Sequence, residues 1–600
     1  MEDEARPAIE HVTMPDDPLL VEAGSDFDWL TGSGGRLSWL EQRPSTGRSV
    51  VVSLERGQLV GYGVRGGSIG SSLHSYGGRP FVFLGSEGLV AVDASTGCVV
   101  GTGETADSFT YGDLEYDNGE VLAVRERESG DQLVALDRVR GEHGTLHTTD
   151  GFLASPRALG TRIAWSQWAG DVMPWDSSEV WIGHRPNRGR IQQAQRVAGS
   201  PEESALQPTW GPDGTLYFIS DGSGWWNLYR WRDGHVDAVA PVAAECATAP
   251  WESTYSNYVL LPRDRIALTV QSGPEQRLVL VESDLTSRVV DLPYTTIKPY
   301  LAPLGDRVGL IGASPTREPE IALVATDGSN TLDVIRRSSA RPEPARVSVP
   351  EVLRVAAGDA TATVLFYPPL EDSKQPPLIV RPHAGPTYNS ELRLNPEVQF
   401  FTSRGFAVAE VDYRGSTGYG RSFRKALDGG WGHVDVEDCC NVALHLIEAG
   451  RVHTSAVFIS GSSAGGYTAL KAVCDDGPFA LAVARSAIID PQRWRTTAPR
   501  FQRPHATILA SATSPVRADE VRRGVLLIHG VADDVAPVSD VRRLAAAVQD
   551  HGLLVDLLEF DGVGHYLSAA ARRSAVEAEL AAYQAVLSRM RSATPAPGVA

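Results

Sequence analysis

The chain has little cysteine, little lysine and no long hydrophobic run. Its 600 residues include only 5 Cys, which is too few for a disulfide framework, so we expect reduced thiols. No apolar stretch reaches the roughly 18 residues that a membrane-spanning helix needs. Residues 1–18 also lack the basic and apolar regions of a secretory signal. We therefore expect a soluble cytoplasmic protein with no membrane partner.

The charge balance is acidic. Lys and Arg number 55 and Asp and Glu 74, which gives a formal net charge of −19. A polyanion such as DNA or RNA binds through an excess of basic residues. The composition therefore argues against a nucleic acid as the main partner, and it is compatible with a homo-oligomer.

Residues 25–340 repeat one unit, a short apolar strand after a turn and a second strand that ends in a polar turn. One apolar residue marks each unit: Leu37, Phe81, Val121, Ile163, Leu216, Ile266 and Val308. Successive markers are 44, 40, 42, 53, 50 and 42 residues apart, close to the blade length of β-propellers. The spacing predicts a seven-bladed β-propeller. A pair of β-sandwiches is the alternative, but it would not need so regular a period.

After residue 340, strands alternate with helical segments. Continuous apolar strands such as 524–530 are typical of a parallel sheet buried on both faces. Segments such as 538–552 carry the 3.6-residue apolar period of helices. This pattern predicts a doubly wound α/β domain with a mostly parallel sheet and its chemistry at the carboxyl ends of the strands. The predicted divisions are an N-terminal extension (1–24), the propeller (25–340), the α/β catalytic domain (341–592) and a disordered tail (593–600).

The segment Gly461–Gly465 fits the G-x-S-x-G pattern of a nucleophile elbow. It stands between a predicted strand and a predicted helix, which would project the Ser463 hydroxyl out of the sheet. The helix N-terminus would bring the Ala464 N–H beside the developing oxyanion. Gly66–Gly70 fits the same pattern, but it lies among the propeller repeats with no helix after it. We therefore predict an α/β-hydrolase with Ser463, not Ser68, as its nucleophile.

A serine nucleophile needs a base, and in this fold the acid and the histidine follow it in the chain. His565 comes after the last predicted strand and is the expected base. Asp533 and Asp534 follow the strand 524–530, while Asp490 follows an earlier strand. We prefer Asp533 as the acid and keep Asp534 and Asp490 as alternatives.

A second oxyanion donor is expected from the loop that begins His383-Ala384-Gly385, after another strand. An ordinary Gly-Pro turn is the alternative for this loop. Arg414 and Tyr419 lie in a Gly-rich loop that could line the substrate pocket or be a tight structural turn. Nothing in the sequence calls for a metal or another cofactor.

Taken together, the two predicted domains and five segments resemble the prolyl oligopeptidase family of serine peptidases, nearest its acylaminoacyl-peptidase and dipeptidyl-aminopeptidase-like branch. The segments are RPHAGPTY, VDYRGSTGYGRSF, ISGSSAGGYTAL, LLIHGVADDVAP and GVGH. The resemblance covers about residues 25–592. It implies Ser463 as nucleophile, Asp533 as acid, His565 as base, and an oxyanion hole from the Ala464 amide and the 383–385 loop. It also implies that the propeller caps the active site as a size filter.

Four departures from that family's pattern concern the site. Ala384 replaces the first Gly of a His-Gly-Gly-Pro loop, which is tolerable only if its φ is negative. Val535 stands where prolyl oligopeptidases proper have an Arg, so proline specificity is not expected. Tyr566 replaces a Gly, and the segment after Asp490 is shorter than in relatives. We therefore expect an altered pocket.

The main functional prediction is a serine peptidase that hydrolyses short peptides or aminoacyl and N-acyl-aminoacyl amides. The first alternative is an esterase or amidase that acts on a specialised aminoacylated metabolite. The second alternative is a propeller interaction protein whose hydrolase domain is inactive. The complete triad in the right chain order weighs against the second alternative.

Overall fold

The structure, a computed structural model, consists of two compact units, residues 1–343 and 344–600. It describes residues 9–12, 14, 25–85, 88–101, 105, 109–136, 143–338 and 346–593. Most of the predicted N-terminal extension and nearly all of the predicted tail lie outside these residues. The two units are described separately below.

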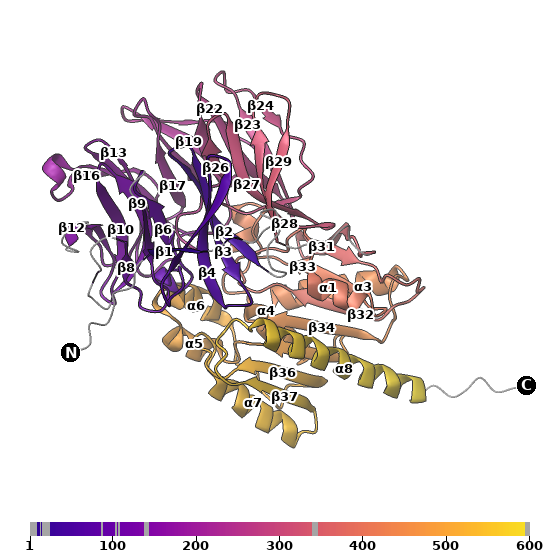
Figure 1. Ribbon diagram of the computed structural model, residues 1–600. Coiled ribbons are helices and arrows are strands. Elements are labelled where there is room, and N and C mark those ends of the chain that lie inside the picture. Colours follow the sequence, from indigo (N-terminus) through magenta and orange to yellow (C-terminus); the bar gives the residue numbers. More distant parts are fainter. Residues whose placement is uncertain are drawn as a thin grey trace, which may run out of the picture. The chain divides into compact units, whose positions relative to one another are not determined.

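The first unit is a seven-bladed β-propeller, as predicted (Figure 1). The first three sheets contain β1 (Ile9–Val12), β2 (Asp26–Ser33), β3 (Arg36–Arg43), β4 (Arg48–Glu55) and β5 (Gln58–Val64); β6 (Phe81–Phe83), β7 (Leu89–Val92) and β8 (Val99–Val100); and β9 (Thr110–Asp117), β10 (Glu120–Glu126), β11 (Gln132–Leu136) and β12 (His143–Thr148). The next two contain β13 (Phe152–Leu159), β14 (Arg162–Trp168), β15 (Glu179–His184) and β16 (Gln192–Ala198); and β17 (Ala205–Trp210), β18 (Leu216–Ser220), β19 (Asn227–Arg232) and β20 (His235–Ala238). The last two contain β21 (Tyr258–Leu261), β22 (Arg265–Ser272), β23 (Glu275–Val281) and β24 (Ser287–Val289); and β25 (Thr296–Ile297), β26 (Ala302–Leu304), β27 (Arg307–Ser314), β28 (Arg317–Ala325) and β29 (Leu332–Arg337).

Residues before position 25 also contribute to the first blade. Strand β1 pairs antiparallel with β5, with Ile9 opposite Val64. The strand therefore extends the first sheet upstream of the point where the repeats become visible in the sequence.

The ring closes between its first and last sheets. Strand β26 contacts β2, and two charged groups of the last blade bind acids of the first. The Arg336 guanidinium donates to Glu41 over 2.9 Å, with both side chains only 1% exposed. Lys298 Nζ donates to Asp28 over 2.7 Å. Because opposite charges as deeply buried as Arg336 and Glu41 must stay paired, this pair holds the ring closed, and the partly exposed pair of Lys298 and Asp28 adds to it.

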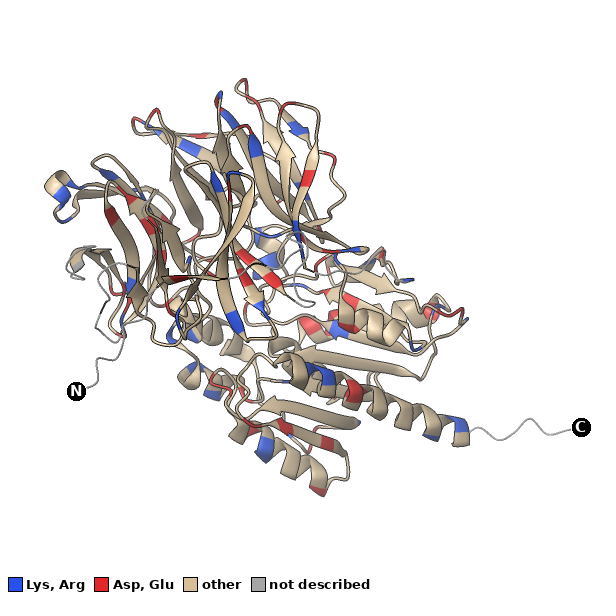
Figure 2. Cartoon of the chain, viewed as in Figure 1, with Lys and Arg blue, Asp and Glu red and all other residues tan. Residues whose placement is uncertain are grey.

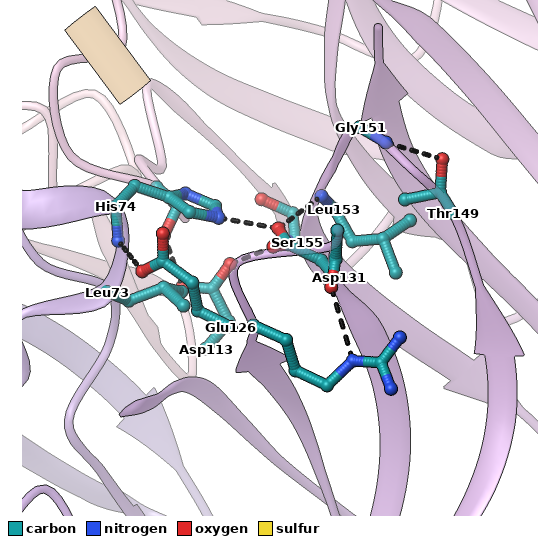
Figure 3. Close-up of polar contacts among 12 residues, drawn as sticks. Leu73, His74, Asp113, Glu126, Asp131, Thr149, Gly151, Leu153 and Ser155 are labelled. Carbon is teal, nitrogen blue, oxygen red and sulfur yellow. Dashed lines mark hydrogen bonds and ion pairs between the residues drawn. The ribbon is translucent and has the colours of Figure 1, made fainter. Parts of the chain in front are cut away.

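A polar network joins three successive blades in the interior of the propeller (Figure 3). His74 Nε2 lies 2.7 Å from Asp131 Oδ2, and the same oxygen accepts the Leu153 N–H over 2.9 Å. The His74 backbone N–H donates to Glu126 over 2.8 Å. Burial lowers the pKa of His74, but the hydrogen bond to Asp131 and the charges of Asp131, Glu126 and Asp113 together raise it more, so the net shift is upward. His74 is thus a structural cross-link between blades.

The second unit is an α/β-hydrolase with an eight-stranded sheet in the order β30-β31-β33-β32-β34-β35-β36-β37. Its strands are β30 (Glu351–Ala357), β31 (Ala360–Tyr367), β32 (Leu378–Pro382), β33 (Ala407–Asp412), β34 (Val457–Ser462), β35 (Leu481–Arg485), β36 (Gly524–Gly530) and β37 (Leu554–Phe560). The six strands from β33 to β37 in this order pair in parallel, while β30 and β31 are antiparallel. Parallel strands end at one edge, which collects the loops that follow them.

Helices cover both faces of this sheet. They are α1 (Pro396–Thr402), α2 (Arg421–Lys425), α3 (Val434–Glu448), α4 (Ala464–Lys471), α5 (Pro491–Thr497), α6 (Arg503–Leu509), α7 (Val538–Asp550) and α8 (Ala569–Ala593). One hydrophobic core packs α3 to α7 against the sheet, and the other packs α1 and α8 against its opposite face. A sheet buried on both faces explains the continuous apolar strands of the sequence. The fold class predicted from the sequence is confirmed.

Charged residues are mixed over both units. Segments with Lys or Arg and segments with Asp or Glu are scattered among each other in the view of Figure 2. Among the helices that the structure describes, none has the length and apolar character needed to cross a lipid bilayer.

Candidate active site

Ser463 occupies a tight turn between β34 and α4. Its backbone has φ 54° and ψ −117°, a conformation that a non-glycine residue rarely adopts and that nucleophile elbows share. A Cβ on Gly461 would lie 2.1 Å from the Gly465 carbonyl oxygen. The first glycine of the motif is therefore required by a backbone contact across the turn.

His565 links the serine to an acid. Its Nε2 lies 3.0 Å from Ser463 Oγ, and its Nδ1 lies 2.9 and 3.0 Å from the two carboxylate oxygens of Asp533. The three residues follow β34, β36 and β37 at the carboxyl edge of the sheet. The side chains of Asp533 and His565 are 0% and 7% exposed. The geometry is that of a Ser-His-Asp triad.

The carboxylate of Asp533 is held by its own loop. Its Oδ1 accepts the N–H groups of Val535 and Ala536 over 2.9 and 2.8 Å. His529 supports the loop from β36, because its Nε2 donates to the Ala536 carbonyl over 2.8 Å. Burial lowers the pKa of His529, which favours its neutral form. The acid therefore has a fixed orientation toward His565.

The two alternative acids have other surroundings. The Asp490 carboxylate caps the N-terminus of α5, where it accepts the N–H groups of Gln492 and Arg493 over 3.0 and 3.1 Å. Asp534 is exposed. The structure thus brings Asp533, rather than either alternative, into contact with His565.

The Ala464 amide and the loop after β32 lie next to each other. Ala464 is the first residue of α4, where N–H groups have no partner within the helix. A Cβ on the neighbouring Gly465 would lie 2.5 Å from the Pro382 carbonyl and 2.8 Å from that of His383. The second glycine of the elbow therefore lets this loop pass close to the helix N-terminus.

The loop itself has a backbone suited to its sequence. Gly385 has φ 126°, whereas Ala384 is not among the described non-glycine residues with positive φ. The requirement that φ at Ala384 be negative is therefore met. The His383 ring stacks on Tyr413 at 4.3 Å, and its Nε2 lies 2.7 Å from Ser416 Oγ. Burial lowers the pKa of His383 to about 4. His383 is therefore a neutral side chain that its neighbours hold in place, and a role of this loop in an oxyanion hole stays a prediction.

Arg414 and Tyr419 bind neighbours in their own region. Arg414 donates to Asp438 over 2.7 Å and to Glu437 over 2.6 Å. The Tyr419 hydroxyl donates to Asp412. These contacts suit a structural loop, and a role of either residue in the pocket stays a prediction.

A pocket of about 510 Å³ borders His565, within the size range of small-ligand sites; Ser463 and Asp533 are not among the described residues that line it. Its wall includes Ala384, Ser462, His565 and Tyr566. Tyr566, the departure noted in the sequence, is 74% exposed. The aromatic ring beside the base is thus accessible to a substrate.

Gly530 is a residue of the site that the sequence reasoning missed. A Cβ on Gly530 would lie 2.4 Å from the carbonyl oxygens of both Val563 and Gly564, which directly precede His565. Its position at the end of a buried strand, three residues before Asp533, was the available signal.

Among the described residues, no group of three or more His, Cys, Asp or Glu is placed to hold a metal ion.

Comparison with known proteins agrees with this geometry. Residues 392–589 match the prolyl oligopeptidase family model. The structure is similar to a puromycin-hydrolyzing peptidase of Mycobacterium tuberculosis, with TM-score 0.86 and 29% identity over 93% of this chain and 94% of that one. A solved puromycin hydrolase gives TM-score 0.85 and 26% identity over 94% of each chain.

A curated relative is the acylamino-acid-releasing enzyme of Arabidopsis thaliana, which is 29% identical over 217 residues, or 33% of this chain. The matched segment spans only 28% of that enzyme's length. The family match falls on the hydrolase unit and contains the nucleophile elbow, Asp533 and His565. The resemblance seen in the sequence is confirmed: residues 392–589 of this chain match the prolyl oligopeptidase family.

Proposed function

We propose that this protein is a serine peptidase that hydrolyses short peptides or aminoacyl and N-acyl-aminoacyl amides through an acyl-enzyme. The observation that carries the proposal is the unbroken chain of hydrogen bonds from Ser463 through His565 to Asp533. These side chains meet where the fold collects its catalytic loops. Neither a metal nor another cofactor is needed for this chemistry.

In the first half-reaction, Ser463 Oγ bonds to the substrate carbonyl carbon while its proton passes to His565 Nε2. The negative charge on the carbonyl oxygen is held by the Ala464 N–H and an amide of the 383–385 loop. The carbon–nitrogen bond then breaks, and His565 returns the proton to the leaving amine. An acyl-Ser463 ester remains.

In the second half-reaction, water takes the place of the amine. His565 removes a proton from the water, the hydroxide oxygen bonds to the acyl carbon, and the ester bond to Ser463 breaks with return of the proton to Oγ. Asp533 keeps the His565 proton on Nδ1 during both steps and stabilises the imidazolium. The products are a free carboxylic acid and an amine.

The substrate class rests on the relatives and on the pocket. One similar structure is named a peptidase and one curated relative is named an acylamino-acid-releasing enzyme, so these names do not favour an esterase or an inactive interaction protein. A pocket of about 510 Å³ accommodates a few side chains. With Val535 in place of an Arg near the acid, no preference for proline is proposed.

Covalent labelling tests whether Ser463 is a nucleophile. A fluorophosphonate probe should label the wild type, and the Ser463→Ala variant should lose the label. The Ser68→Ala variant is the matched control, because Ser68 lies in the second G-x-S-x-G segment, Gly66–Gly70, which is part of the propeller. An unlabelled wild type, or label that survives Ser463→Ala, would contradict the proposal.

A substrate panel separates peptidase from esterase. Aminoacyl anilides, N-acyl-aminoacyl anilides, simple acyl esters and puromycin, an aminoacyl amide, would be compared by kcat/KM. We expect the amides to be cleaved by the wild type and not by Ser463→Ala. Rapid cleavage of the esters alone would overturn the peptidase assignment.

The size filter and the cellular location belong to the same proposal. If the propeller restricts entry, kcat/KM should fall as the peptide substrate becomes longer, and a kcat/KM that does not change with peptide length would refute the filter.

A cytoplasmic location is supported by the five cysteines, which form no disulfide among the described residues. Cell fractionation would test it.

A further inference from the structure

The pocket of about 510 Å³ that borders His565, here called the base pocket, lies on one side of the sheet. Glu397 of α1 and Arg572 of α8 line it. These two helices pack against one face of the sheet, whereas α3 to α7 pack against the other face and contribute no described residue to the wall. Helix α4, which begins after Ser463, belongs to the second group. The base pocket therefore opens on the side of the nucleophile away from α4, whose N-terminus is expected to hold the oxyanion.

The wall of the base pocket includes the base but not the nucleophile. His565 and the two residues after it line the pocket from the loop after β37, and residues 460–462 line it from the end of β34. Ser463 and Ala464 are not among the described residues of the wall. In the proposed acylation step His565 returns its proton to the leaving nitrogen, which must then lie within hydrogen-bond reach of Nε2. The part of the substrate beyond that nitrogen is therefore the part nearest the base pocket.

The charges of the wall balance. Of the described residues that line the base pocket, four are arginines and three are glutamates. Glu397 Oε2 accepts from Arg381 over 2.9 Å and from Arg485 over 2.8 Å. Arg485 also donates to Glu579, a buried fourth glutamate that is not itself part of the wall. An ion would find no excess of opposite charge here and would lose its hydration, so the wall favours an uncharged ligand.

Two aromatic side chains of the wall are accessible. Tyr566 is 74% exposed, and its ring lies edge-on to that of His565 with the centroids 5.5 Å apart. Tyr388 is 39% exposed and lies edge-on to the His383 ring at 6.4 Å. Exposed aromatic rings in a pocket bind flat apolar groups well, because ring contacts add to the buried apolar area. The accessible wall thus suits an aromatic or flat apolar ligand.

We propose that the base pocket receives the leaving half of the substrate, an uncharged amine with an aromatic or flat apolar group, and that Tyr566 selects for it. The proposal rests on the proposed peptidase function, because only a substrate cleaved at Ser463 has a leaving half. The carbon–nitrogen bond breaks, the proton on His565 passes to the nitrogen, and the free amine leaves through the base pocket. Tyr566, which replaces a Gly of the family pattern, thereby has a role in specificity.

Four peptides that combine two acyl halves with two leaving halves test the assignment. The acyl halves are the best two of the substrate panel, and the leaving halves are phenylalanine amide and glycine amide. In Tyr566→Ala, kcat/KM should fall about ten-fold for both phenylalanine amides, the effect of losing one aromatic contact, and should stay within about two-fold for both glycine amides. Tyr566→Phe keeps the ring and should behave as the wild type. A loss that follows the acyl half, or an equal loss for all four peptides, would overturn the proposal.

The charge of the leaving half is tested with the wild type. A peptide that ends in free phenylalanine should be cleaved with a kcat/KM at least about five-fold below that of its phenylalanine amide, because the balanced wall does not repay the desolvation of a carboxylate. Equal or faster cleavage of the free acid would refute the uncharged class. Leu444→Ala, at a side chain 43% exposed on α3, is the control and should change none of these values.

The acyl-enzyme supplies a readout that a folding defect does not imitate. Once the amine has left, Tyr566 has no part of the substrate to contact, so water should hydrolyse the acyl-enzyme at the same rate in the wild type and in Tyr566→Ala. Added phenylalanine amide re-enters the base pocket: its nitrogen bonds to the acyl carbon, the ester bond to Ser463 breaks, and the amine proton passes through His565 to Oγ. The ratio of this transfer to hydrolysis should fall about ten-fold in Tyr566→Ala. An unchanged ratio, or slower hydrolysis by water, would sink the proposal.

Failure of this assignment and failure of the peptidase function are separable. If amides are cleaved but Tyr566→Ala treats all leaving halves alike, only the assignment of the base pocket is refuted. If esters alone are cleaved, the peptidase function fails, and the same comparison with benzyl and methyl esters decides the assignment. A wild type that neither reacts with the fluorophosphonate nor cleaves any substrate refutes both.

Discussion

Replacement of Asp533 by Asn is the most discriminating test of the catalytic geometry. Asp533 Oδ1 accepts two backbone N–H groups of its loop, over 2.9 and 2.8 Å, and both carboxylate oxygens face His565 Nδ1. An Asn side chain keeps the shape, and its single oxygen can keep the two backbone hydrogen bonds. Its NH₂ group must then point toward His565 Nδ1.

The expected loss follows from this reversal. A donor opposite Nδ1 forces the His565 proton onto Nε2, which faces Ser463 at 3.0 Å and can then no longer accept the serine proton. In other serine hydrolases the same wrong tautomer lowers turnover by about 10⁴. At about 1.4 kcal/mol per factor of ten, that is about 5.5 kcal/mol of transition-state stabilisation. Folding should change little, since the loop contacts survive.

The assay is kcat/KM on the best amide of the panel, with two matched Asp→Asn variants as controls. Asp534→Asn changes the exposed neighbour, and Asp490→Asn changes the cap of α5, where Asn serves as well as Asp. Both should stay within a few-fold of the wild type. Near-normal activity of Asp533→Asn, or a loss of about 10³ or more in Asp490→Asn, would refute the assignment of the acid.

Three further predictions concern the elbow and the propeller. Gly465→Ala should abolish fluorophosphonate labelling, because its Cβ would lie 2.5 Å from the carbonyl oxygen of Pro382 at the end of β32. For His74, burial lowers the pKa and the surrounding acids, Asp131 foremost, together raise it more, so its stabilising charge is fully present below about pH 6.5 and is lost as the pH rises through the raised value. The melting temperature of the wild type should therefore fall above pH 6.5 by more than that of His74→Gln. Glu41→Gln strands Arg336 in the interior and should cost about 3–5 kcal/mol in chemical denaturation, whereas the double variant Glu41→Gln/Arg336→Met should regain part of it.

The strands of the hydrolase unit were visible in the sequence because the sheet is buried on both faces. Segments such as β36 are continuous apolar runs, and the helices α3, α4, α7 and α8 are long enough to show a 3.6-residue period. The antiparallel edge strand β30 and the helices α1, α2, α5 and α6 were not predicted. The strand is mostly exposed, and these helices have only five to seven residues, too few to establish a period.

In the propeller, the sequence revealed the middle of each blade and missed its inner strand. Most of the marker residues, such as Leu37 and Val121, lie in second strands such as β3 and β10. The inner strands β2, β9, β13 and β17 contain β-bulges, where the register shifts against the next strand. The bulges contain non-glycine residues with positive φ, namely Trp29, Asp113, Ser155 and Gln207. A bulge breaks the alternation of apolar and polar side chains by which a strand is recognised in a sequence. These segments therefore resembled loops between strands.

The identity of the catalytic acid shows where sequence reasoning ends. Asp490, Asp533 and Asp534 all follow buried strands, and residue type alone cannot rank them. Backbone geometry does: Asp490 turns back to cap the helix that it begins, while the loop amides after Asp533 hold that carboxylate toward His565. The resemblance names Asp533, which is the aspartate that lies against His565 in the structure.

Three glycines explain how the triad is built. Gly461 faces the backbone of its own turn, Gly465 faces the loop after β32, and Gly530 faces the segment before His565, each at a distance where a Cβ would collide with a carbonyl oxygen. The nucleophile turn is therefore in direct backbone contact with the end of β32 and the loop after it, and the end of β36 is in direct backbone contact with the segment before His565. Their spacing is set by main-chain packing at the edge of the sheet, which tolerates changes of exposed side chains such as Tyr566. We therefore expect substitutions at Tyr566 to alter substrate preference through KM, while fluorophosphonate labelling of Ser463 persists.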